Sequence, residues 1–123
     1  MAKVKEIFSF LNELSPVARK MDFDNVGLLV GSENADVSKI LVTLDITEKV
    51  ALEAAKMGAE LIVSHHPVIF NPMKRITDDT PEGRRILALI KNGISAICMH
   101  TNLDCSKDGV NDALAKKARY NRI

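Results

Sequence analysis

The chain has 123 residues, a formal net charge of +1 and 46% hydrophobic residues, which is enough for one buried core, so we expect a single domain over residues 1–123. A nearly neutral chain with 4% aromatic residues and no Trp has neither the charge nor the stacking surfaces that favour nucleic-acid binding. No run approaches the roughly 20 apolar residues of a membrane span, and two cysteines give little support for a disulfide. We therefore expect a cytoplasmic protein that binds neither membrane nor nucleic acid.

The amino-terminal segment has the spacing of an amphipathic helix. Apolar residues recur every three or four positions from Val4 to Leu14, and Ser15-Pro16 should end the helix because proline lacks an amide donor. The short apolar run Val26–Gly31 predicts a strand, at an edge of the sheet. We interpret its glycines, Gly27 and Gly31, as turn or bulge positions rather than phosphate cradles.

The next segments form a strand–helix–strand unit. The apolar, β-branched run Lys39–Asp45 predicts a strand covered on both faces in a parallel sheet. Thr47 can cap a helix that Gly58 ends, and Leu61–Val63 is the following strand. This order predicts two parallel strands joined by a helix.

A second unit follows after a polar loop. Thr80-Pro81 supplies a cap and a first-turn proline for a helix that Gly93 ends, and Ile94–Met99 is the next strand. Val110–Ala118 has helical spacing, so the cluster Lys116–Arg119 is interpreted as the solvated face of a last helix. No element is predicted after that helix. The pattern predicts an α/β fold with a mainly parallel or mixed sheet flanked by helices.

Polar residues follow each of the three predicted parallel strands. Asp45 follows the first, His65 and His66 follow the second, and His100 and Asp104 follow the third. Because the carboxyl ends of parallel strands meet at one edge, where ligands of open α/β sheets bind, we expect these side chains to share one crevice. Neutral imidazole is the commonest protein ligand for transition metals, so the adjacent histidines could serve two metal ions.

Other interpretations of these residues stay open. His100 alone could be a loop residue bonded to backbone or water, and Asp45 could simply cap the turn that follows its strand. Cys98 is interpreted as core packing. Cys105 could be a soft metal ligand, which keeps a zinc site of cysteine and histidine possible.

Four ordered motifs resemble a known family, and they span nearly the whole chain. They are Asp24-Asn25-Val26-Gly27-Leu28-Leu29-Val30-Gly31, Leu44-Asp45-Ile46-Thr47, Ser64-His65-His66-Pro67-Val68-Ile69-Phe70, and His100-Thr101-Asn102-Leu103-Asp104 with Gly109-Val110-Asn111-Asp112. The chain resembles the amino-terminal part of the GTP cyclohydrolase 1 type 2 homologue family, also described as Nif3-like. Such chains are typically about twice as long, so this chain looks like a truncated or split version.

The resemblance implies a centre of two divalent metal ions. The family's histidine pair and aspartate ligands map onto His65, His66 and Asp104, whereas its late histidine and glutamate ligands have no counterpart here. It implies a metal-dependent hydrolase acting on a nucleotide or related small molecule, with His100 as acid or base and Asp45 orienting ligands. The alternative is a non-catalytic metal-binding or interaction module. The resemblance also implies homo-oligomers, commonly hexameric rings, and leaves zinc, iron, manganese and nickel undistinguished.

Overall fold

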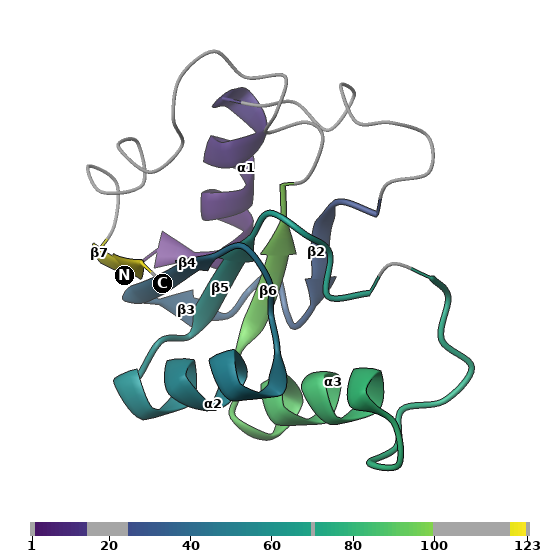
Figure 1. The fold of residues 1–123 in the computed structure, drawn as a ribbon. Coiled ribbons are helices and arrows are strands. Elements are labelled where there is room, and N and C mark those ends of the chain that lie inside the picture. Colours follow the sequence, from purple (N-terminus) through teal and green to yellow (C-terminus); the bar gives the residue numbers. More distant parts are fainter. Residues whose placement is uncertain (1, 15–24, 70, 100–118, 123) are drawn as a thin grey trace.

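The computed structural model describes residues 2–14, 25–69, 71–99 and 119–122 (Figure 1). Its main sheet has five strands in the order β2-β6-β5-β4-β7. The described elements are β1 (Ala2–Lys3), α1 (Val4–Leu14), β2 (Gly27–Val30), β3 (Asp36–Val37), β4 (Lys39–Thr43), α2 (Glu48–Met57), β5 (Leu61–Ser64), α3 (Pro81–Lys91), β6 (Ser95–Cys98) and β7 (Arg119–Arg122). Strands β4, β5, β6 and β7 are parallel and β2 is antiparallel to β6, which confirms the predicted mixed α/β sheet.

The sheet lies between two helical layers, as Figure 1 shows, with α1 on one face and α2 and α3 on the other. Alternate residues of β4 and β5 point to opposite faces, so both faces of these strands must be apolar. Leu41 and Ile62 pack towards α2 and α3, while Ile40 and Val63 pack towards α1. The near-continuous apolar composition of these strands follows from this two-sided burial.

Helices α2 and α3 begin after the cap residues that the sequence indicates. The Thr47 hydroxyl accepts the Val50 amide at 3.1 Å, and the Thr80 hydroxyl accepts the Gly83 amide at 3.0 Å. Both contacts satisfy amides that have no partner within their helix. Gly58 adopts a left-handed φ of 77° at the end of α2, a conformation that favours glycine.

Strand β2 is a short edge partner of β6, as predicted. Gly27 and Gly31 have φ angles of 105° and 111°, and the register with β6 shifts between Leu28 and Val30. A Cβ built on Gly31 would lie 2.8 Å from the Ser95 Cα, so this position needs glycine for space as well as for conformation. The two glycines are therefore turn and bulge positions.

The sequence did not predict three of the strands. β1 and β3 are two-residue segments that pair antiparallel, too short to show any periodicity. Strand β7 pairs with β4 through residues 119–122, so placing Arg119 on a last helix, with no element beyond it, is wrong. The polar run Arg-Tyr-Asn-Arg carries no apolar alternation, and its pairing satisfies backbone groups of β4 that would otherwise form an open edge. The helix predicted over Val110–Ala118 lies outside the described residues.

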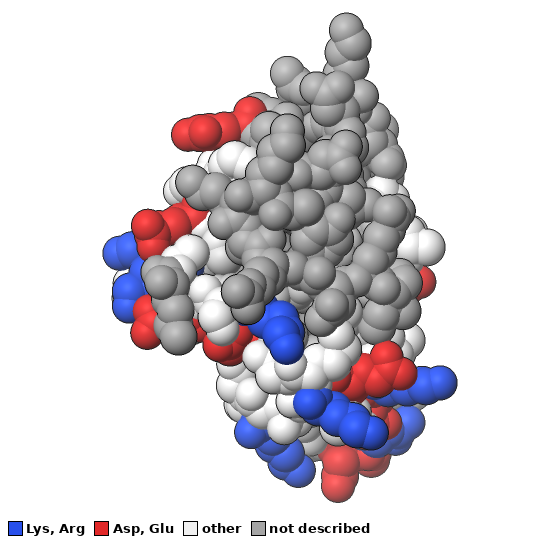
Figure 2. Space-filling model, turned by 90° about the vertical axis from the view of Figure 1, so that its left-hand side faces the viewer, with Lys and Arg blue, Asp and Glu red and all other residues white. Residues whose placement is uncertain are grey.

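The described surface carries both signs of charge. On the face drawn in Figure 2, basic and acidic side chains are interspersed around the described part, in keeping with the net charge of +1. No helix among the described residues is long and apolar enough to cross a membrane.

Candidate metal centre

The ends of β4 and β5 bring two polar segments together at the carboxyl edge of the sheet. Beyond the last paired residues, the His65 amide donates to the Thr43 carbonyl at 3.2 Å and the His66 amide to the Leu44 carbonyl at 2.9 Å. The parallel pairing therefore continues past both strands. It places the residue after Leu44, Asp45, beside His66.

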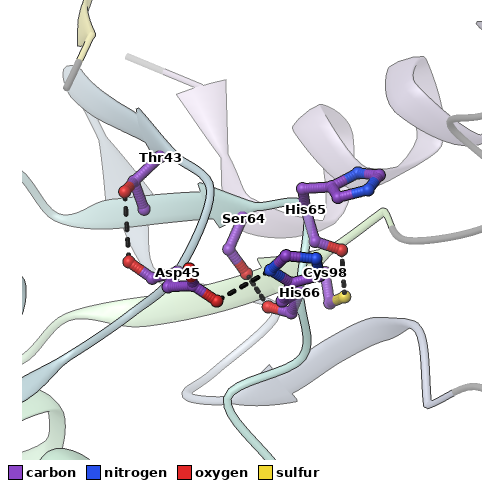
Figure 3. A network of polar contacts seen from close by, with 6 residues as sticks. All are labelled: Thr43, Asp45, Ser64, His65, His66 and Cys98. Atoms are coloured by element: carbon purple, nitrogen blue, oxygen red, sulfur yellow. Dashed lines mark hydrogen bonds and ion pairs between the residues drawn. The ribbon is translucent and has the colours of Figure 1, made fainter.

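The carboxylate of Asp45 contacts the imidazole of His66, as Figure 3 shows. The Asp45 Oδ1 and His66 Nδ1 atoms are 2.7 Å apart, and the two side chains are 62% and 48% exposed. A carboxylate on Nδ1 keeps a proton on that nitrogen, which makes Nε2 the nitrogen that can bind a metal. Helix α2 is capped by Thr47, and the Asp45 side chain contacts the His66 ring.

The two histidine rings lie beside each other. Their centroids are 4.9 Å apart and their planes are tilted by 59°. In an extended strand, neighbouring side chains point to opposite faces, but β5 ends at Ser64 and the chain bends directly after it. Since ions in two-metal sites are typically about 3.5–4 Å apart, neighbouring rings at this separation suit a shared centre.

Two buried side chains form hydrogen bonds with the backbone of the histidine pair. The Ser64 hydroxyl donates to the His66 carbonyl at 2.8 Å, and the Cys98 thiol donates to the His65 carbonyl at 3.4 Å (Figure 3). Cys98 is 1% exposed, which confirms its interpretation as core packing and adds a contact that its position in the sequence did not reveal. These bonds fix the point at which the chain leaves the sheet.

The described residues supply part of a metal-binding set. His100, Asp104 and Cys105 lie outside the described residues, and within the described part no group of three His, Cys, Asp or Glu side chains is close enough to hold an ion. Two adjacent imidazoles, one oriented by a carboxylate, have the donor chemistry of a divalent transition-metal centre. The described part of the predicted site is therefore a pair of imidazole donors with one orienting carboxylate, short of a complete ligand set.

A pocket that the sequence did not predict begins at the residue after His66. The cavity has a volume of about 390 Å³ between the loop that starts at Pro67 and the first turns of α3. Three basic residues line it, Lys74, Arg75 and Arg85. The adjacent Lys74-Arg75 pair was the available sequence signal, but nothing in the sequence brings Arg85 to it.

The chain is similar to known proteins over nearly its whole length. A model of the Duf34/NIF3 (NGG1p interacting factor 3) family matches residues 2–123. A GTP cyclohydrolase 1 type 2 homolog of Clostridium perfringens is 46% identical over 120 residues, which are 98% of this chain and 46% of that protein. The GTP cyclohydrolase 1 type 2 of Helicobacter pylori is 46% identical over 104 residues, covering 85% of this chain and 42% of that protein.

A solved structure shares the fold. The crystal structure of a Bacillus cereus protein related to NIF3 superposes with a TM-score of 0.83 at 43% identity, over 94% of this chain and 32% of that one. Fold and site thus define a mixed-sheet α/β protein with a histidine pair at the carboxyl edge of its parallel strands. The chain belongs to the Duf34/NIF3 family, that of the GTP cyclohydrolase 1 type 2 homologues. It spans less than half the length of these curated relatives.

Proposed function

We propose that the chain contributes His65, His66 and Asp104 to a centre of two divalent metal ions in a metal-dependent hydrolase. The contact between Asp45 and His66, 2.7 Å long, carries this proposal because carboxylates commonly orient metal-binding histidines in this way. The 4.9 Å separation of the two rings supports a shared centre. Bound divalent ions supply a water of lowered pKa as nucleophile and polarise the substrate.

The chain's own residues have separate tasks in this proposal. Asp45 holds the His66 ring in one tautomer, and the Ser64 and Cys98 bonds keep both histidine carbonyls turned into the fold. His100, the third histidine, is the proposed acid or base; in the sequence it comes two positions after Cys98, the last residue of β6.

The proposed substrate class is a purine nucleotide or related small molecule, suggested by the name of the Helicobacter pylori relative, GTP cyclohydrolase 1 type 2. In a reaction of that class, water adds to the carbon between the imidazole nitrogens of guanine and one carbon–nitrogen bond breaks to leave a formamide. A second water then hydrolyses the formamide to formate and an amine. Proton transfer to the departing nitrogens is the step assigned to His100.

The test is formate release from GTP by the wild-type protein with added Mn²⁺, Fe²⁺ or Zn²⁺. We expect metal-stimulated release that a His65→Ala/His66→Ala variant loses while it keeps its circular dichroism spectrum. A wild type that retains metal yet releases no formate from GTP would contradict cyclohydrolase activity and leave metal binding standing.

The second candidate is a metal-binding or interaction module without turnover. One observation favours it: the description of the family names an interacting factor. Fold alone does not determine a reaction. A module of this kind should form a stable complex with a second chain that supplies a histidine and a glutamate, and should show no metal-stimulated hydrolysis.

We further propose that copies of the chain associate into homo-oligomers. Within the described sheet, β2 pairs only with β6 and β7 only with β4, so each is an end strand with backbone groups able to pair. Light scattering should give a mass above that of the 13.5 kDa chain. A monodisperse monomer would refute this association.

A further inference from the structure

The pocket next to the histidine pair has the dimensions of a ligand site. Its volume of about 390 Å³ lies within the range of roughly 300–1,000 Å³ that small-molecule sites occupy. Its wall begins at Pro67, which directly follows His66 in the chain, so the pocket starts beside the segment that carries the proposed metal ligands. The lining residues are Pro67, Val68, Ile69, Asn71, Pro72, Met73, Lys74, Arg75, Thr80, Glu82 and Arg85.

The loop that forms one wall is attached to the body of the fold. Val68 is 5% exposed and packs in the core beneath α2 and α3. The Asn25 side chain donates to the Ile69 carbonyl at 2.7 Å, which ties the wall to the segment before β2. These contacts give the pocket a defined shape before any ligand binds, which lowers the entropic cost of binding.

The charged groups of the pocket are mainly cationic. Lys74, Arg75 and Arg85 oppose one acidic side chain, Glu82, although the chain as a whole is nearly neutral. The pocket also touches the first turn of α3, where the helix dipole favours an anion. The local charge therefore selects for negative ligands.

Arg85 has an unsatisfied donor. Its Nε atom is buried and has no hydrogen-bond partner among the described residues, whereas the neighbouring Arg84 contacts the Glu48 carboxylate at 3.4 Å. A buried donor left unpaired destabilises the fold, so few native groups stay in that state. Arg85 also lines the pocket, and guanidinium groups pair especially well with the oxygens of phosphate.

We infer that this pocket binds the phosphate groups of a phosphate ester, with the partly buried Arg85 on the α3 side and Lys74 and Arg75 at its loop wall. The inference deepens the proposed function, on which it rests for the identity of the nucleotide: phosphates held here leave the rest of the molecule next to His65 and His66. Glu82 weakens anion binding and limits how tightly the phosphates are held.

The test uses inorganic pyrophosphate as probe, titrated calorimetrically into the chelator-treated chain. We expect Arg85→Gln to weaken binding about tenfold or more, because a charge-assisted contact is lost, and Lys74→Gln to weaken it about two- to fivefold. Glu82→Gln should tighten binding about two- to fivefold, a gain that misfolding does not produce. Lys49→Gln, the same exchange on the exposed surface of α2, should leave binding unchanged.

Competition identifies the source of the phosphate. GTP should displace pyrophosphate and guanosine should not, since guanosine lacks the charged groups. Stronger displacement by GTP than by inorganic phosphate indicates a nucleotide ligand. Absent pyrophosphate binding, or binding that neither Lys74→Gln nor Glu82→Gln alters, would overturn the inference even if Arg85→Gln fails to fold.

The same experiment separates this inference from the proposed function. A His65→Ala/His66→Ala variant should bind pyrophosphate as the wild type does, because the pocket and the histidine pair use different residues. Unchanged pyrophosphate binding without formate release would contradict cyclohydrolase activity and keep the phosphate pocket. Formate release without pyrophosphate binding would support cyclohydrolase activity and refute the phosphate pocket.

Discussion

Two carboxylates at opposite ends of the same pair of strands show how structural and site residues differ in this fold. Glu60 immediately precedes β5, and Asp45 follows β4 at the other end. The Glu60 carboxylate accepts the backbone amides of Ser38 and Lys39 at 3.1 Å and 3.0 Å. Asp45 instead contacts an imidazole, and its side chain is 62% exposed.

The partners decide what each carboxylate does. Burial raises the pKa of Glu60, but the hydrogen bonds from Ser38 and Lys39 outweigh it and bring the pKa below its ordinary value of 4.5. Its ionised form is thus a structural link between the beginnings of β4 and β5. Asp45 acts on a side chain at the open edge, so its loss should alter the site and spare the fold. Substitutions along these strands test whether structural and site residues are separate in this way.

The largest expected effect on stability is at the centre of the sheet, far from any site role. Ile62 is fully buried in the core between the sheet and the α2/α3 layer. Ile62→Ala should lower the free energy of unfolding by about 2–5 kcal/mol, since it removes buried surface and leaves a cavity. Denaturant unfolding measures this change.

The matched control is the same exchange on the loop before α3. Ile76 is 45% exposed, so Ile76→Ala should change the free energy of unfolding by less than about 0.5 kcal/mol. Equal effects at both positions would mean that the described core does not dominate stability.

The next effect tests the site end of the comparison. Asp45→Asn removes the charge that orients His66, and loss of such a partner typically weakens metal affinity by about 10–100-fold. The free energy of unfolding should stay within about 0.5 kcal/mol of the wild type because the side chain is exposed. Competition with a chromophoric chelator measures the affinity, with Asp78→Asn, at another exposed aspartate, as control. Unchanged metal affinity in Asp45→Asn would show that Asp45 does not orient a metal ligand.

A smaller effect on the free energy of unfolding is expected at Glu60, at the other end of strands β4 and β5. Glu60→Gln should lower the free energy of unfolding at pH 7 by about 1–2 kcal/mol, because two amides lose a charged acceptor at a partly exposed position. Since the folded pKa lies below the unfolded one, the contribution of Glu60 is present above the unfolded value and is lost as pH falls through the folded value. The wild-type advantage should therefore disappear in acid.

Denaturant titrations at several pH values measure that advantage. Glu53→Gln, on α2, is the control and should give no comparable pH dependence. A wild-type advantage that persists at pH 2 would refute the electrostatic account of Glu60.

The sequence predicted those features that arise from local chemistry and periodicity. Continuous apolar runs identified β4 and β5 as strands with two covered faces, and Thr47 and Thr80 marked the beginnings of two helices. Parallel order then placed Asp45 near His66, which the 2.7 Å contact confirms as a spatial prediction. The roles of these residues stay predictions.

The sequence did not predict features that depend on tertiary contacts. Strand β7 is polar and is defined by its pairing with β4. The pocket depends on a loop and a helix that bring Arg85 to Lys74 and Arg75, which are ten or more positions away in the chain. The closeness of the two histidine rings depends on the bend after Ser64, which strand alternation alone does not predict.

The most direct test of the account is the metal content of protein purified without chelator, measured by mass spectrometry beside a His65→Ala/His66→Ala variant whose folding is checked by circular dichroism. If the histidine pair anchors a metal centre, the wild type should hold close to two equivalents of divalent metal, and a folded variant should lose them. A folded wild type that takes up no metal, even after reconstitution, would contradict the assignment of a metal centre to the histidine pair.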